Sequence, residues 1–274
     1  MIKKSFPLVS EEMIFRFQSR RKKMKYLVWA AAFIAGLAAY MTKKAFENNL
    51  IHHDIQLKDM PLERPVRVLF ISDLHRRKIP LRWAQSLPEA DIVFIGGDMT
   101  EKGVPWSFVE HNARILSQLA PCYFVYGNND EEVDKTRLTN ILEAYGITVL
   151  ENKAVLYRNA YSEGIWIAGI GDITYRKDNV DATLRPTEGG PVILLSHDPR
   201  VVNKLNPSVH GPVNLILSGH THGGQVRIFG KGPYEKGGLF PIQSGHHLIS
   251  NGYGTSFLPI RLGADPEVHF ISIT

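Results

Sequence analysis

The chain has 274 residues, enough for one large domain with an additional tail. Hydrophobic residues make up 44% of the sequence and charged residues 22%, a balance that favours a sizeable core over bulk disorder. The net charge is +5, but residues 1–25 alone carry eight Lys or Arg and two Glu, which leaves the other 249 residues at −1. A nucleic-acid-binding domain concentrates positive charge on its folded body, so this distribution disfavours nucleic acid as a partner.

An unbroken apolar run of 16 residues, 26–41, follows the basic leader 1–25. A membrane span takes about 20 residues, with about 17 as the lower end, whereas signal-peptide cores run to roughly 15, so this run falls between the two classes. No small-residue cleavage site follows the run. That favours a retained transmembrane anchor or signal-anchor over residues 26–44, rather than a cleaved signal. The third alternative, a buried core helix, is disfavoured by the basic flank.

The charges around this segment predict its orientation. The positive-inside rule places the leader in the cytoplasm and the rest of the chain, membrane-anchored, in an extracytoplasmic position. Arg20 and Arg21 are also similar to a twin-arginine export signal, although Lys23 stands where that signal usually has an aromatic residue. The export route and the retention of the segment stay open. Residues 45–65 are predicted as a short polar linker and residues 66–274 as the globular domain.

From Val66 onward, short apolar runs alternate with turn residues, and seven runs are predicted as strands. These runs are Val66–Ile71, Ile92–Ile95, Tyr123–Tyr126, Ile165–Ala168, Val192–Leu195, Val213–Leu217 and Val268–Ile273. Helical spacing covers residues 106–119 and 136–145, and Gly146 is a plausible C-cap for the second helix. The single cysteine, Cys122, lies in an apolar stretch and is predicted to be buried. The alternation of strand and helix predicts an α/β fold.

Polar residues follow five of the predicted strands directly. The segments are Ser72-Asp73-Leu74-His75, Gly96-Gly97-Asp98, Gly127-Asn128-Asn129-Asp130, Ser196-His197-Asp198 and Ser218-Gly219-His220-Thr221-His222. The carboxyl ends of strands line one edge of an α/β sheet, so carboxylates, imidazoles and a carboxamide are expected to collect there. A set of nitrogen and oxygen donors without a thiolate suits manganese, iron or zinc.

In order and spacing, these blocks resemble the calcineurin-like metallophosphoesterase family, and the resemblance covers the chain from about Val66 to its end. C-terminal blocks that begin at Gly252, Pro259 and Pro266 are similar to its membrane-associated or exported bacterial branch (YkuE/YaeI-like), which is related to UDP-diacylglucosamine pyrophosphatases. The resemblance implies a metallophosphoesterase-type sandwich of two mixed β-sheets flanked by helices, here preceded by an N-terminal membrane helix.

The resemblance also implies two divalent metal ions, with manganese first and iron or zinc as alternatives. The first ion would be held by Asp73, His75 and His222, the second by Asn128, His197 and His220, and Asp98 would bridge the two. Such a pair of ions activates water and neutralises phosphoryl charge. The predicted activity is hydrolysis of a phosphodiester or pyrophosphate bond in a phosphorylated small molecule or lipid, such as an envelope precursor of the UDP-diacylglucosamine type. The alternatives are a broad phosphomonoesterase or cyclic-nucleotide phosphodiesterase, and a metal-binding scaffold with weak turnover.

Further residues receive roles around this centre. Asp130 is expected to accept a hydrogen bond from a ligand imidazole. Three arginines are candidate phosphate clamps: Arg76, Arg77 and Arg261. Arg261 is preferred because it lies in the family-like C-terminal block. Asp172 is either a further acceptor behind the site or, more simply, a turn residue, and residues 246–247, a His pair, are predicted as a loop feature.

Asn129 stands where the family usually has a His. An amide can donate a hydrogen bond to a substrate but cannot supply a proton at neutral pH. We therefore expect either slow turnover or a substrate with a good leaving group, such as a nucleoside diphosphate linkage.

The variant Asn129→His tests this interpretation. It should raise kcat on an ester with a poor leaving group, because general-acid help typically contributes about 10²–10⁴-fold. An ester with a good leaving group serves as the control and should gain little. Unchanged turnover on the poor leaving group would count against a catalytic role for this position.

Overall fold

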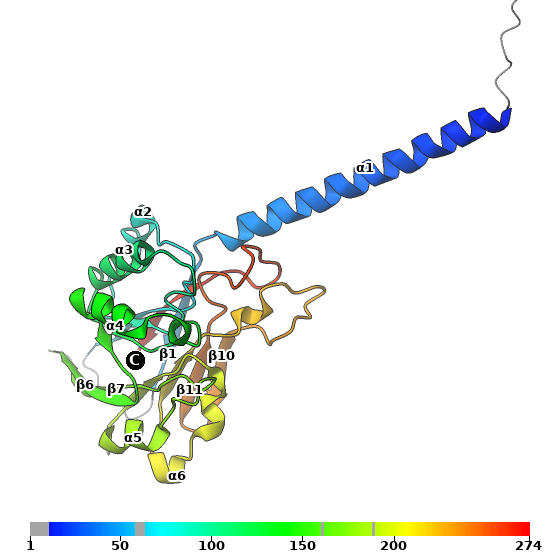
Figure 1. Ribbon diagram of the computed structural model, residues 1–274. Helices are drawn as coiled ribbons and strands as arrows, with labels where there is room; N and C mark the ends of the chain where they lie inside the picture. The colour runs from blue at the N-terminus through cyan, green and yellow to red at the C-terminus, as the bar shows by residue number, and fades with distance from the viewer. Residues whose placement is uncertain (1–10, 58–63, 160–161, 188–189) are drawn as a thin grey trace, which may run out of the picture.

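The computed structural model describes residues 11–57, 64–159, 162–187 and 190–274. Two β-sheets pack face to face, helices cover their outer faces, and one long helix projects from the domain (Figure 1). This architecture confirms the predicted sandwich of two mixed sheets flanked by helices.

Each sheet contains six strands. The first sheet has the order β1 (Leu50–Ile55), β12 (Val268–Ile273), β2 (Val66–Ile71), β3 (Ile92–Ile95), β4 (Cys122–Phe124) and β5 (Thr148–Val149). The second has the order β10 (Gly238–Ile242), β11 (Gly245–Ile249), β9 (Leu215–Ser218), β8 (Val192–Leu195), β7 (Ser162–Gly169) and β6 (Lys153–Asn159). Strands β2 to β5 are parallel, as are β7, β8, β9 and β11, while β12, β6 and β10 run antiparallel to a neighbour. Every predicted strand overlaps one of these.

The helices are short apart from the first. They are α1 (Glu11–Ala45), α2 (Leu81–Ala84), α3 (Trp106–Ser117), α4 (Lys135–Ala144), α5 (Val180–Leu184) and α6 (Pro207–His210), with 3₁₀ turns at Asp130–Glu132, Arg185–Thr187, Pro199–Lys204 and His222–Gly224. Helices α3 and α4 confirm the two helical predictions. Helix α4 begins where the Asp134 side chain accepts a hydrogen bond from Arg137 N at 3.0 Å, and after it Gly146 adopts φ 75°.

The central strands are buried on both faces, which explains their continuous apolar sequences. Successive side chains of β2 point in opposite directions, so Val68 and Phe70 enter the core between the sheets, while Leu69 and Ile71 pack under α3 and α4. A third cluster, which includes Leu184 of α5, covers the outer face of the second sheet. The carboxyl ends of the parallel strands are thereby fixed between well-packed layers.

The N-terminal helix α1 is one continuous helix from Glu11 to Ala45, so the predicted division between leader and anchor at residue 25 is not a helix boundary. Over residues 15–45 it is long and apolar enough to span a membrane, and none of its apolar window is buried in the domain.

The predicted linker, residues 45–65, is wrong in its central part. Residues 50–55 form β1, which pairs in parallel with β12. Ile55 and Leu57 are 1% and 5% exposed and belong to the core between the sheets. A strand at the edge of a sheet has one polar, solvated side, and the sequence His52-His53-Asp54 made this strand look like a linker.

The predicted loop at His246-His247 is also wrong, since both residues lie in β11. The His247 ring is buried, its Nε2 lies 3.0 Å from Ser218 Oγ, and burial lowers its pKa to about 4. Cys122 is buried as predicted, in β4.

Truncation of one β1 side chain tests the role of this strand. Ile55→Ala should lower the free energy of unfolding by about 2–5 kcal/mol, the usual cost of deleting a fully buried Ile side chain. The matched control, Ile51→Ala in the same strand, removes a side chain that is 38% exposed and should cost much less. Urea unfolding of the full chain in detergent measures both, and equal small effects would contradict the packing of β1 against the core.

Candidate metal centre

The residues predicted as metal ligands all follow strands whose carboxyl ends lie at one edge of the sandwich. Strands β2, β3 and β4 of the first sheet and β8 and β9 of the second deliver them. The two sheets are held together at this edge by Asp73, whose backbone N donates to Gly97 O at 2.9 Å and whose carboxylate accepts from His220 N at 3.1 Å.

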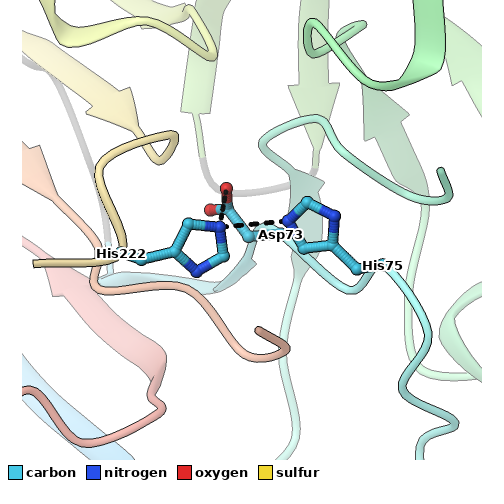
Figure 2. Close-up of side chains that lie close together, drawn as sticks. All are labelled: Asp73, His75 and His222. Carbon is cyan, nitrogen blue, oxygen red and sulfur yellow. Dashed lines mark hydrogen bonds and ion pairs between the residues drawn. The ribbon is translucent and has the colours of Figure 1, made fainter. Parts of the chain in front are cut away.

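One group of donor atoms comprises Asp73, His75 and His222 (Figure 2). The Nε2 atoms of His75 and His222 lie 3.0 Å apart, and His222 Nε2 is 3.4 Å from Asp73 Oδ1. All three side chains are buried. Their donor atoms therefore point at a common position, as the ligands of a single cation do.

A second group comprises Asn128, His197 and His220. Asn128 Oδ1 is 2.8 Å from His220 Nδ1 and 3.2 Å from His197 Nε2, and the two ring nitrogens are 3.2 Å apart. An Asn side chain supplies a carbonyl oxygen without adding negative charge. These atoms form a second convergent set of one oxygen and two nitrogens.

Asp98 lies between the two groups. Its Oδ2 is 3.6 Å from His75 Nε2 in the first group and 3.4 Å from His197 Nε2 in the second. Burial alone would raise the pKa of the Asp98 carboxyl, but the His197 and His75 imidazoles and the amide of Asn129 outweigh it and lower this pKa well below its usual range. The carboxylate is therefore anionic and shared, as the predicted bridging ligand requires.

The backbone at this edge adopts an unusual conformation. Five of the seven predicted ligands have positive φ angles: Asp73 (56°), His75 (49°), Asp98 (51°), His220 (73°) and His222 (51°). Such angles cost a non-glycine residue of order 1–3 kcal/mol each. Their concentration here means that the fold holds these side chains in place against local preference, which is typical of functional sites.

Glycines make room for the carboxylates. A Cβ on Gly127 would lie 2.2 Å from Asp98 Oδ1, and a Cβ on Gly219 would lie 2.3 Å from Asp73 Oδ2. Real Cβ atoms do not approach so closely, so only glycine fits at these two positions.

The imidazoles are oriented by contacts on their outer nitrogens. His197 Nδ1 lies 2.8 Å from the carbonyl of Gly96, which fixes a proton on Nδ1 and turns Nε2 toward the site. Burial lowers the pKa of His222 to about 3, and burial together with nearby His197 lowers that of His220. Burial would also lower the pKa of His197 and His75, but nearby carboxylates outweigh it and raise the pKa of both rings. A bound cation would therefore displace protons from these two rings, whereas His220 and His222 are already neutral. Imidazoles and carboxylates are the donor set that divalent Mn, Fe and Zn take, so the residues present fit such ions.

Two predicted catalytic residues, Asn129 and Asp130, make hydrogen bonds to Asp98 and to the backbone in this structure. Asn129 donates from its backbone N to Asp98 Oδ1 at 2.8 Å and from its side chain to Oδ2 at 2.7 Å. Asp130 accepts from Thr100 N at 3.1 Å and Gly127 N at 2.9 Å, so it ties two site loops together instead of orienting an imidazole. Burial and the Asp98 charge raise the Asp130 pKa to about 7.

The three candidate phosphate clamps bind backbone carbonyls or a carboxylate in this structure. Arg261 is fully buried and donates to backbone carbonyls, including those of Asn251 and Gly254 at 2.6 Å, while its Nη2 lies 3.3 Å from His222 Nδ1. Arg77 is buried against carbonyls at the end of α1, and Arg76 pairs with Glu101. The buried contacts of Arg261 and Arg77 correct the phosphate-clamp interpretation for these two residues, whereas the Arg76 side chain is 59% exposed and its role stays a prediction.

Sequence reasoning missed Glu101, whose Oε2 lies 3.0 Å from His75 Nδ1. Its position three residues after Asp98 was the available signal, but an acidic residue in a polar loop carries little information by itself. Asp172, in contrast, is the predicted turn residue, because its Oδ1 accepts from Tyr175 N at 2.8 Å.

The sequence of this chain is similar to those of known proteins. The calcineurin-like phosphoesterase family model matches residues 66–224. The chain belongs to the calcineurin-like phosphoesterase family. It is 39% identical over 261 residues to the uncharacterized protein YpbG of Bacillus subtilis, covering 91% of this chain and 98% of that protein.

Two other relatives carry descriptive names. Phosphodiesterase YaeI of Escherichia coli is 28% identical, covering 76% of this chain and 82% of its own. A transmembrane protein with metallophosphoesterase domain from Danio rerio is 29% identical, covering 88% of this chain and 61% of its own. Membership in this family, which uses divalent metals, identifies the chain as a metal-dependent phosphoester hydrolase.

Neutralising Glu101 tests its contact with His75. Glu101→Gln keeps the size of the side chain but removes the charge beside His75 Nδ1, and should weaken metal affinity or kcat/KM by roughly 10–100-fold, as is usual for residues behind metal ligands. Glu89→Gln, at a glutamate whose side chain is 90% exposed, is the control. Competition with a chromogenic chelator measures the affinity. An affinity and kcat/KM equal to those of the control would show that Glu101 does not support His75.

Proposed function

We propose that the chain is a binuclear phosphodiesterase or pyrophosphatase that hydrolyses a phosphate linkage in a lipid-linked or nucleotide-linked substrate at a membrane surface. The observation that carries the proposal is the convergence of two donor groups, the first buried and the second half-buried, on one shared carboxylate, Asp98. The proposed ligands are Asp73, His75 and His222 for one ion and Asn128, His197 and His220 for the other. We propose manganese as the ion, with iron or zinc as alternatives, because the donors are nitrogen and oxygen only.

When bound, two such ions supply Lewis-acid activation of the attacking water and neutralise charge that builds on the phosphoryl oxygens. The protein contributes a rigid frame for this chemistry. Asp98 stays anionic, His220 and His222 stay neutral, and Asn129 holds Asp98 through two hydrogen bonds. With its amide donated to Asp98, Asn129 is not a proton source, which favours substrates whose leaving group departs without protonation.

Two features support a substrate at a membrane. Helix α1 is apolar enough to span a bilayer, and the Danio rerio relative is named as a transmembrane protein. The name of the Escherichia coli relative supports a phosphodiester linkage. With the basic leader in the cytoplasm, the catalytic domain would lie on the extracytoplasmic side.

Loss of the shared carboxylate tests the enzymatic proposal. Asp98→Asn should lower kcat/KM on bis(4-nitrophenyl) phosphate with Mn²⁺ by more than about 100-fold, since even residues behind metal ligands cost 10–100-fold. The control Asp181→Asn changes a carboxylate that is 70% exposed on α5 and should leave the rate unchanged. Activity that survives in Asp98→Asn would contradict the shared site, and wild-type protein that binds metal but hydrolyses nothing would be a scaffold.

Substrate scope is tested separately with the full chain in mixed micelles. A UDP-linked lipid should be cleaved with a higher kcat/KM than 4-nitrophenyl phosphate or a cyclic nucleotide. The reverse order would support the broad monoesterase or cyclic-nucleotide alternative and leave the binuclear site intact.

A further inference from the structure

Two loops beside the end of α1 present large apolar side chains to solvent. Phe229 is 100% exposed, Phe257 95%, and Ile228 and Leu258 62% each. We call these four residues the apolar lip. Both loops project from the side of the domain from which α1 leaves, the first in gold and the second in orange-red (Figure 1).

The two phenylalanines of the apolar lip have left-handed backbones. Phe229 has φ 51° and Phe257 has φ 60°. Positive φ in a bulky residue is rare and costs free energy, and full exposure of an aromatic ring brings no compensating burial. Two such residues on adjacent loops indicate a surface shaped for a contact outside the domain.

Hydrogen bonds connect the lip to the metal centre. Gln225 Nε2 donates to Leu258 O at 3.0 Å, and Ser256 N donates to Gln225 Oε1 at 2.9 Å, which connects the two loops. Arg227 Nη1 donates to Gly223 O at 2.9 Å, next to the ligand His222. A surface that binds the lip therefore also lies against the side of the metal centre where His222 is located.

Helix α1 is fixed to the same side of the domain. Arg261 N donates to Met41 O at 3.0 Å, and Arg77 donates to the carbonyls of Ala45 at 3.2 Å and Phe46 at 2.8 Å. Met41 is the last residue of the apolar run, so no flexible linker separates that run from the domain.

The length of α1 places the lip at the depth of a membrane surface. At 1.5 Å per residue the apolar run 26–41 extends about 24 Å, whereas a bilayer core is about 30 Å thick. A run shorter than the bilayer core thins the membrane locally, which brings its surface toward the ends of the run. The apolar lip lies beside the C-terminal end. Three exposed lysines lie near this surface: Lys43 at the end of α1, and Lys231 and Lys236 in the chain that follows Phe229. Their positive charges suit anionic head groups.

We propose that the apolar lip inserts into the bilayer leaflet where α1 ends, and that it holds the domain with the His222 side of its metal centre against lipid head groups. The inference rests on the proposed membrane anchoring by α1. It gives the enzyme access to phosphate groups at the membrane surface, because hydrogen bonds connect the lip to the segment that carries His222.

Site-specific fluorescence of the full chain in vesicles tests the proposal. Phe229→Cys and, separately, Phe257→Cys are labelled with a nitrobenzoxadiazole fluorophore, and Val209→Cys, exposed 68% on α6 at the distant end of the domain, is the control (Figure 1). The native Cys122 stays unlabelled, because it is 3% exposed and burial raises its pKa to about 12. The vesicles contain phosphatidylcholine, phosphatidylglycerol and a phospholipid spin-labelled near its head group.

Labels on both lip positions should be quenched about twofold or more beyond the control, because inserted side chains lie roughly 5–10 Å into the head-group boundary. If the lip labels are quenched no more than the label at position 209, in protein that resists alkaline carbonate extraction, the proposed insertion of the lip is wrong. Membrane anchoring by α1 would still hold. A blue shift without lipid quenching would assign the lip to a protein partner or a second copy, which also overturns the proposal. Extraction by carbonate would refute the anchoring itself, and hydrolysis of the soluble ester would still report on the metal centre.

Discussion

The shared carboxylate of Asp98 is the interaction on which the geometry of the centre depends. It lies within 3.6 Å of an imidazole from each donor group while buried from water. Such a group is tolerated only where opposite charge and hydrogen bonds compensate for lost hydration. Asn129 supplies the hydrogen bonds, and His75 and His197 supply the nitrogen atoms that surround the carboxylate. Two cations on either side would complete this compensation.

The packing of the two sheets brings loops from both of them together at one edge. Phe70 and Leu217 belong to the core between the sheets, and beyond their strands lie Asp73 and His220. The hydrogen bonds from His220 N to Asp73 link the sheets at the site itself. Core packing thus balances the strain of five left-handed ligand residues, which a less rigid edge would relax.

Sequence alone predicted the parts that follow from local patterns. Continuous apolar runs predicted the buried strands, and the polar residues after Ile71, Ile95 and Leu217 predicted the candidate ligands that the structure brings together. It did not predict β1, because an edge strand with polar residues at 52–54 lacks an apolar run. Arg261 was misassigned for a different reason: its partners are backbone carbonyls, and no residue type in the sequence marks them. Local patterns therefore indicate candidate ligands, and only the tertiary structure shows which residues support them.

The most direct test of the account is the electron paramagnetic resonance spectrum of the purified full chain loaded with Mn²⁺, recorded together with its metal content. Ions that share one carboxylate lie about 3.5–4 Å apart and are exchange-coupled. The account predicts two ions per chain with a coupled multiline spectrum. A single bound ion, or a spectrum of isolated Mn²⁺ at full loading, would contradict it.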